Sequence, residues 1–163
     1  MAKNKEEKTN VMRVLEQKKI AYTPHSYPHE EGIAVDGVTV AKSMGFDPAI
    51  VFKTLVARGA SKQYYVFDVP VAENLDLKKA AKAVGEKSIE MIHQKELLPL
   101  TGYVHGGCSP VGMKKLFPTV IDASAENLET MIVSAGKIGY QVELAPRDLA
   151  ALVRAKFADI IAR

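Results

Sequence analysis

The run of small and rigid residues at Gly106–Gly112 is the part of this sequence best suited to chemistry. It holds three glycines, a cysteine, a serine and a proline between two apolar segments. Glycine permits backbone conformations and close approaches that a Cβ would block, and proline fixes φ and removes a hydrogen-bond donor. Such a loop can present bare backbone N–H groups to a ligand that carries oxygen atoms. We therefore take it as one wall of a candidate binding site.

Cys108, the only cysteine of the chain, lies in the middle of this loop. A catalytic cysteine must ionise, and a free pKa near 8.5 leaves only a few per cent of a thiol ionised at neutral pH. His105 precedes it by three residues, but closeness in sequence does not place an imidazole at the sulfur. The alternative is a small buried hydrophobic side chain, which is the commoner use of an isolated cysteine.

The four histidines form no recognisable metal-binding pattern. His25 and His29 are spaced as two ligands on one helix turn would be, but Pro24 and Pro28 oppose a helix there. A zinc site would also need a third ligand in a recognisable relation to them. We expect neither a metal site nor a bound cofactor.

Lys53 stands inside the apolar run Ile50–Val56, which is typical of a strand. Alternation along a strand places Lys53 on the same face as two apolar neighbours, Val51 and Leu55. A lysine at the mouth of an apolar pocket can bind a carboxylate, a phosphate or a carbonyl oxygen. The alternative is a solvated lysine on an exposed strand face.

A second turn of small residues, Ser134–Gly139, separates two further strand-like segments. It is either a simple hairpin turn or the wall of a pocket opposite Gly106–Gly112.

The elements that must position these residues include both helices and short strands. Hydrophobic periodicity, caps and turn residues predict helices at Val11–Ile20, Thr39–Met44 and Asp76–Gly85, with a last helix opened by Pro146. Strands are predicted at Tyr22–Tyr27, Ile50–Ala57, Tyr64–Val69, Tyr103–His105, Thr119–Asp122, Met131–Ser134 and Tyr140–Leu144. This mixture indicates an α+β domain around a curved sheet.

Length and composition fit a single soluble domain over residues 1–163, with 47% hydrophobic and 25% charged residues. No apolar run approaches the roughly 20 residues of a membrane span, and the charged N-terminus lacks the apolar core of a signal peptide. A single cysteine suits a reducing compartment. We expect a cytoplasmic protein without membrane contact.

The net charge of +3 is too small to identify a nucleic-acid binder by itself. Lysines gather at Lys78, Lys79, Lys82 and Lys87, and again at Lys114 and Lys115. They are either solvated surface charges or a phosphate-facing patch beside the glycine-rich loop.

An ordered set of motifs resembles the YbaK/EbsC family of aminoacyl-tRNA deacylases, which includes the prolyl-tRNA synthetase-associated editing domain. The resemblance covers essentially the whole chain. It implies an α+β domain with a mixed, strongly curved, barrel-like sheet and surrounding helices. The matching segments are Val51–Leu55, Leu75–Lys82, Thr101–Tyr103, Gly106–Gly112, Pro118–Asp122, Val133–Lys137 and Ala155–Ile160.

The resemblance also implies a function, the clearing of mischarged Cys-tRNA(Pro) and also of Cys-tRNA(Cys). Editing is needed because side chains of similar size differ by only about 1–3 kcal/mol in a binding pocket. In this family the thiol of the substrate attacks its own aminoacyl ester and releases a cyclic thioester. No enzyme nucleophile is then required, and catalysis rests on proximity.

By the same resemblance, Lys53 matches the essential lysine and positions the 3′ end of the aminoacyl-tRNA. The remaining expected contacts with the substrate are Tyr27, Gly106, Gly107, Ser109, Pro110, Ser134 and Gly136. A transient complex with prolyl-tRNA synthetase is expected as well.

Three residues depart from the pattern of the family. Ala135 stands where other members carry glycine, and Gln141 stands where some carry an aspartate. An uncharged amide cannot act as a base, so a role of that carboxylate is not available here. Cys108 stands where an aliphatic residue is common, which favours packing over catalysis.

Two alternatives remain open from the sequence. A relative of the same fold could instead hydrolyse Ala-tRNA or Ser-tRNA with an activated water. The chain could also be a non-catalytic module that binds tRNA or a synthetase, with phosphate contacts from Lys78, Lys79, Lys82, Lys114 and Lys115.

Overall fold

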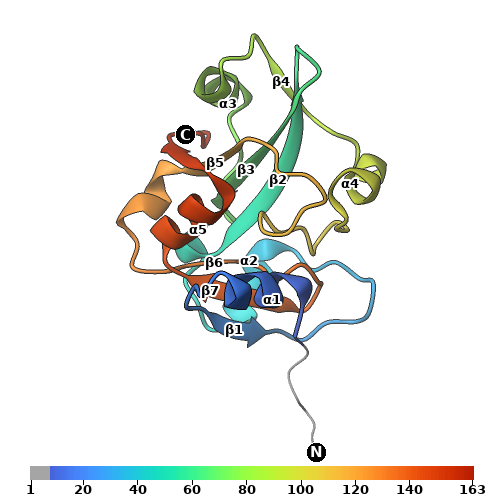
Figure 1. The fold of residues 1–163 in the computed structure, drawn as a ribbon, viewed down its shortest axis with the longest axis vertical. Coiled ribbons are helices and arrows are strands. Elements are labelled where there is room, and N and C mark those ends of the chain that lie inside the picture. The colour runs from blue at the N-terminus through green and yellow to red at the C-terminus, as the bar shows by residue number, and fades with distance from the viewer. Residues whose placement is uncertain (1–7) are drawn as a thin grey trace, which may run out of the picture.

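Two β-sheets and five α-helices carry the fold in the computed structural model, which describes residues 8–163 (Figure 1). Residues 1–7, to which the expectation of no signal peptide applies, lie outside the described residues. Within residues 8–163, no helix has the length and apolar character needed to cross a membrane.

The larger sheet has five strands in the order β4-β2-β3-β5-β8. Strand β2 pairs antiparallel with β3 and with β4, whereas β3–β5 and β5–β8 are parallel pairs. The strands are β2 (Phe52–Gly59), β3 (Tyr64–Pro70), β4 (Ile89–Met91), β5 (Thr119–Asp122) and β8 (Lys156–Ala158).

The smaller sheet has three antiparallel strands in the order β1-β7-β6. They are β1 (Thr23–Ser26), β6 (Met131–Ser134) and β7 (Tyr140–Leu144). An isolated bridge between Val51 and Ile132 links this sheet to the start of β2. This link brings β6 and β7 next to the segment that carries Lys53.

The helices are α1 (Asn10–Gln17), α2 (Gly37–Ser43), α3 (Leu77–Val84), α4 (Gln94–Thr101) and α5 (Pro146–Val153). Asp76 caps α3 by accepting from the backbone of Lys78 and Lys79, and Gly85 ends it in the left-handed conformation. Pro146 opens α5, as predicted.

The main core lies between the two sheets. It joins Phe52 and Val66 of the larger sheet to Val133 and Val142 of the smaller one, together with buried residues of α1 and α5. A second cluster covers the other face of the larger sheet beneath α3. Both faces of this sheet are therefore buried, which is the main source of its stability.

The mixed α+β class is confirmed, but the barrel-like curvature is not. Each sheet of the described residues has a linear strand order with two ends, and neither closes on itself.

The strand predicted at Tyr103–His105 is wrong, because this segment forms no sheet pairing. The hydroxyl of Tyr103 donates to the carbonyl of Val111 at 2.5 Å, and the backbone N–H of Tyr103 donates to Thr101 Oγ1 at 3.0 Å. These bonds hold the segment as the base of the glycine-rich loop. Helix α4, which directly precedes it and contains Pro99, was not predicted.

Candidate functional site

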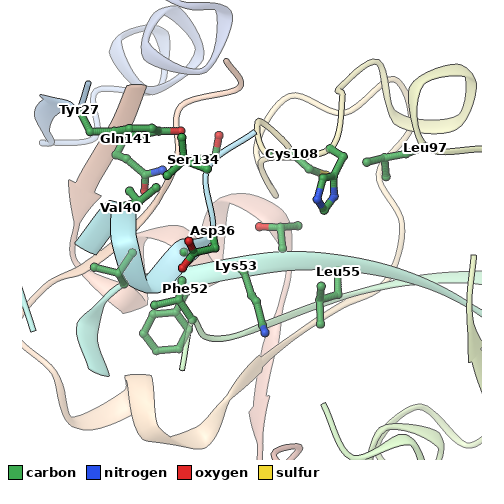
Figure 2. A pocket seen from close by; sticks show the side chains of 17 residues that line it. Tyr27, Asp36, Val40, Phe52, Lys53, Leu55, Leu97, Cys108, Ser134 and Gln141 are labelled. Atoms are coloured by element: carbon green, nitrogen blue, oxygen red, sulfur yellow. The ribbon is translucent and has the colours of Figure 1, made fainter. Parts of the chain in front are cut away.

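A cavity of about 290 Å³ lies along the first half of β2 (Figure 2). Both sheets, α2 and the glycine-rich loop contribute to its walls. The lining residues are Tyr27, Val35, Asp36, Gly37, Val40, Val51, Phe52, Lys53, Thr54, Leu55, Val71, Leu97, His105, Gly106, Cys108, Ser134 and Gln141.

The cavity borders a free strand edge. Strand β4 pairs with Ala57–Gly59 and β6 bridges to Val51, so Lys53–Leu55, between these contacts, have a strand partner on the β3 side alone. The Val51 carbonyl accepts from Val71 on that side, whereas the Val56 carbonyl accepts from Ile92 on the other. Because backbone groups alternate in direction, those of Thr54 point the same way as those of Val56, toward the free edge.

Lys53 lines this cavity, as the sequence predicts for a functional lysine. Burial lowers its pKa, and the charge of Glu73 partly opposes this shift. Figure 2 shows the Lys53 side chain leaving β2 on the side away from Cys108 and Ser134. A ligand that contacts the ammonium group and the glycine-rich loop together must therefore cross the strand edge.

The smaller sheet supplies a polar cluster on the opposite wall. Ser134 and Gln141 are register partners on β6 and β7, and Tyr27 follows β1 and donates its backbone N–H to Gly139 at 3.0 Å. Figure 2 shows the three side chains grouped together. Burial raises the pKa of Tyr27, so its hydroxyl stays protonated at neutral pH. The Gln141 Oε1 atom is buried without a hydrogen-bond partner among the described residues.

The two small-residue loops are packed against each other. A Cβ added to Gly107 would lie 3.0 Å from the backbone nitrogen of Ile138, and Gly106 adopts a φ of +91°. Glycine permits the left-handed conformation at Gly106 and the close approach at Gly107 at low cost. Gly106 and Ser134 both line the cavity, which supports the interpretation of the second loop as a further wall.

Four of the expected substrate contacts do not face this cavity. Gly107 contacts the second loop, and Gly136 lies against Tyr103. Ser109 is fully buried and accepts from the N–H of Val111 at 3.2 Å. Pro110 lines a separate small cavity. In this structure these residues shape the loops, and their direct contact with substrate stays a prediction.

Cys108 is a buried thiol and not an ionised nucleophile. Burial, followed by the charge of Asp68, raises its pKa to about 12. A thiol with this pKa carries a negligible thiolate fraction at neutral pH. The structure agrees with the packing role expected from the sequence.

Several polar residues at the cavity were not predicted. Asp36 caps α2 through the backbone N–H and hydroxyl of Thr39, and these bonds lower its pKa, so it is an anion at the rim. Thr54 and His105 also line the cavity, although neither was among the expected substrate contacts.

His25 and His29 have separate partners and do not form a pair of ligands. His25 pairs with Glu143 at 2.8 Å, and His29 Nδ1 lies 2.8 Å from the carbonyl of Tyr27. In the part of the chain that the structure describes, no three His, Cys, Asp or Glu side chains are grouped so that they could hold a metal ion.

Comparisons with known proteins identify the family of this chain. Residues 34–152 match the model of the aminoacyl-tRNA editing domain family. The chain is 45% identical over 161 residues to "Putative Cys-tRNA(Pro)/Cys-tRNA(Cys) deacylase EbsC" of Enterococcus faecalis (strain ATCC 700802 / V583), covering 98% of each chain.

Solved structures share the fold. The crystal structure of "a putative trans-editing enzyme for prolyl tRNA synthetase" superposes with a TM-score of 0.79 at 25% identity, covering 94% of this chain and 95% of that one. A hypothetical protein superposes with a TM-score of 0.82 at 20% identity, covering 93% of this chain and 99% of the other, which shows the fold alone. The chain therefore belongs to the family of aminoacyl-tRNA editing domains.

Proposed function

We propose that this chain, as a single domain over residues 1–163, deacylates Cys-tRNA(Pro) and also Cys-tRNA(Cys). The observation that carries the proposal is a cavity that holds a half-buried cation, Lys53, while its only cysteine is kept as a neutral thiol. A site without its own thiolate suits a substrate that brings the nucleophile. The name of the 45% identical relative supports the same substrate class.

The strand edge separates two functions within the cavity. On one side the Lys53 ammonium binds the phosphate or ribose oxygens of the tRNA 3′ end. On the other side the Gly106 loop, Ser134 and Tyr27 enclose the aminoacyl group. The protonated Tyr27 hydroxyl can donate to an oxygen of the substrate.

Chemistry follows from this confinement. The substrate thiol, held against its own ester carbonyl, forms the sulfur–carbon bond, and the bond to the ribose oxygen breaks. Holding two reacting groups in contact lowers the activation barrier by several kcal/mol in favourable systems. The cavity walls act by keeping the thiol and the ester carbonyl in this contact.

Hydrolytic editing of Ala-tRNA or Ser-tRNA is the second candidate. His105 and Asp36 line the same cavity and could orient a water molecule toward an ester. The product distinguishes the two reactions, because hydrolysis needs no thiol and yields no cyclic thioester.

We further propose that prolyl-tRNA synthetase supplies part of the tRNA affinity. Two of the candidate phosphate-binding lysines already have partners within the chain: Lys79 pairs with Asp159 at 3.2 Å, and Lys114 donates to the Pro99 carbonyl at 3.3 Å. A surface engaged in this way favours weak binding of tRNA alone. Cross-linking that detects no complex with the synthetase in the presence of tRNA would contradict this partner.

A deacylation panel tests the function. Cys-, Ala- and Ser-tRNA(Pro) are incubated with wild type, Lys53→Ala and the surface control Lys18→Ala. We expect rapid loss of Cys-tRNA in wild type and Lys18→Ala, with release of the cyclic thioester, and little loss in Lys53→Ala. Equal rates in all three proteins would reject the catalytic site. Salt-sensitive tRNA binding without any deacylation would identify a non-catalytic binding module instead.

A further inference from the structure

Asp68 is a buried carboxylate whose hydrogen-bonding capacity the fold satisfies only in part. It lies on β3, is fully buried, and its Oδ2 atom has no hydrogen-bond partner among the described residues. Burying a carboxylate with a missing partner is costly, and such groups are normally paired. Asp122 on the neighbouring strand β5 shows the contrast, because its oxygens accept from the backbone of Ser124 and Ile160.

The one side-chain hydrogen bond that Asp68 makes among residues 8–163 leads to the cavity. Thr54 is its register partner on β2, and the Thr54 hydroxyl donates to Asp68 Oδ1 at 2.5 Å. Thr54 also lines the cavity. Because the hydroxyl proton is committed to Asp68, only the oxygen lone pairs of Thr54 are left to accept from a ligand.

Thr54 lies on the face of β2 where the proposed substrate would place its aminoacyl group. Side chains alternate along β2, so Thr54 points to the face opposite Lys53. Phe52 and Val56, which share that face with Thr54, belong to the main core together with Cys108 of the glycine-rich loop. A ligand with its 3′ end at Lys53 therefore brings its aminoacyl group toward Thr54.

We propose that Thr54 and Asp68 form a two-residue proton relay that serves as the general base for the attacking thiol, a role that rests on the proposed deacylation. The thiol proton passes to Thr54 Oγ1 while the Thr54 hydroxyl proton passes to Asp68 Oδ1, and the sulfur forms its bond to the carbonyl carbon. When the bond from this carbon to the ribose oxygen breaks, the oxygen takes the proton back through Thr54. The enzyme ends unchanged.

The surroundings of Asp68 set its proton affinity. Burial raises its pKa to about 7, and the Thr54 bond opposes this shift. A base is most effective at neutral pH when its pKa is near 7. On β2 the residue that faces Asp68 is Thr54, since Lys53 points away. On β5 the residue that faces it is Ile121, its register partner. From the glycine-rich loop the facing residue is Cys108, which stays a neutral thiol.

The relay explains how the site works with an amide at Gln141. A carboxylate at that position could act as a base, and an amide cannot. Asp68 supplies a carboxylate from the opposite sheet, reaching the cavity through Thr54.

Single-turnover deacylation of Cys-tRNA(Pro) between pH 5.5 and 9 tests the relay. For wild type we expect a rate that rises with pH through about 7, because Asp68 must be ionised to accept the proton. For Asp68→Asn and Thr54→Val we expect rates about 100-fold lower at neutral pH. Their rise should move toward the pKa of the thiol itself, about 8.5.

Two further variants separate the relay from a structural role. Thr54→Ser keeps the hydroxyl and should retain the wild-type pH profile. Asp122→Asn alters an equally buried aspartate that does not line the cavity, and should leave the profile in place. An unchanged profile in Asp68→Asn would overturn the relay and leave the deacylase function standing. The relay would also be overturned if the rise of the rate with pH were lost in His105→Asn and kept in Asp68→Asn and Thr54→Val. A wild type that releases no amino acid from any of the tRNAs would overturn both.

Discussion

Gly106 stands so close to Ala34 that a Cβ added to Gly106 would lie 2.7 Å from the Cβ of Ala34. Real Cβ atoms do not approach so closely, and Gly106 also has a φ of +91°. The contact joins the glycine-rich loop to the segment that leads into α2. The loop and α2, which both line the cavity, are thus held at a fixed separation.

Gly106→Ala should therefore lower both stability and activity. The left-handed conformation costs an alanine about 1–2 kcal/mol, and overpacking adds about 1–3 kcal/mol. Gly32→Ala is the matched control, because Gly32 has a φ of +78° with nothing within 4 Å of its added Cβ. Chemical denaturation of both variants measures the contact separately from the conformation. Equal losses in the two would show that the Ala34 contact is unimportant.

Cys108 should behave as an unreactive thiol. Its burial and its pKa of about 12 keep it protonated, so iodoacetamide should label the native protein far more slowly than the denatured one. Cys108→Ala should lose about 1–2 kcal/mol of stability by cavity formation while still deacylating Cys-tRNA. Fast labelling of the native protein, blocked by an aminoacyl-tRNA analogue, would instead indicate a catalytic cysteine.

The elements that sequence reasoning located well are those defined by local signals. Asp76 and Gly85 bound α3, and the β-branched run at Met131–Ser134 is β6. Helix α4 was not predicted, because Pro99 lies inside it and proline opposes a helix in sequence reasoning. Strands β4 and β8 have three residues each, and their pairing partners lie about 30 residues away along the chain, so no local signal marks them.

The site divides in the same way. Lys53 is visible in the sequence as a charge within an apolar strand, and the glycines of the first loop are visible as a cluster. The relation of Asp68 to the cavity depends on the β2–β3 register, which sets it opposite Thr54, and on its electrostatic interaction with Cys108 of the glycine-rich loop. Both are long-range relations, which composition and periodicity do not encode.

The lowered pKa of Lys53 predicts weaker substrate binding on the alkaline side. Burial makes its ammonium lose the proton at a pH below the usual 10.5, so the attraction for tRNA oxygens fades as the pH rises toward that point. An amide-linked aminoacyl-adenosine phosphate, which resists hydrolysis, allows the dissociation constant to be measured from pH 6 to 10. Lys53→Arg, which stays protonated throughout, should show a nearly flat alkaline limb. The same weakening in Lys53→Arg would assign it to another group.

The raised pKa of Asp68 predicts that the stability of the folded chain falls as the pH rises. Its pKa is about 7 in the folded chain and 3.8 as the ordinary value, so the folded state binds more protons than the unfolded state between these limits. Stability must then fall as the pH rises from about 4 to about 7. The full loss corresponds to about 4 kcal/mol, at 1.36 kcal/mol per pKa unit.

Asp68→Asn removes this dependence, so the free energy of unfolding of the variant minus that of wild type should grow by up to about 4 kcal/mol between pH 4 and pH 8. Urea denaturation at a series of pH values measures the difference. Asp122→Asn is the matched control, and should lose about 1–3 kcal/mol because it weakens the acceptor of two backbone N–H groups. If Asp68 were retained for stability, its removal would not stabilise the chain at neutral pH. The stability comparison and the rates together therefore distinguish a role in activity from a role in stability. A difference that stays constant with pH would mean that Asp68 has the same pKa in the folded and the unfolded chain. The relay would then rest on a weaker base, and the rate would not rise through pH 7.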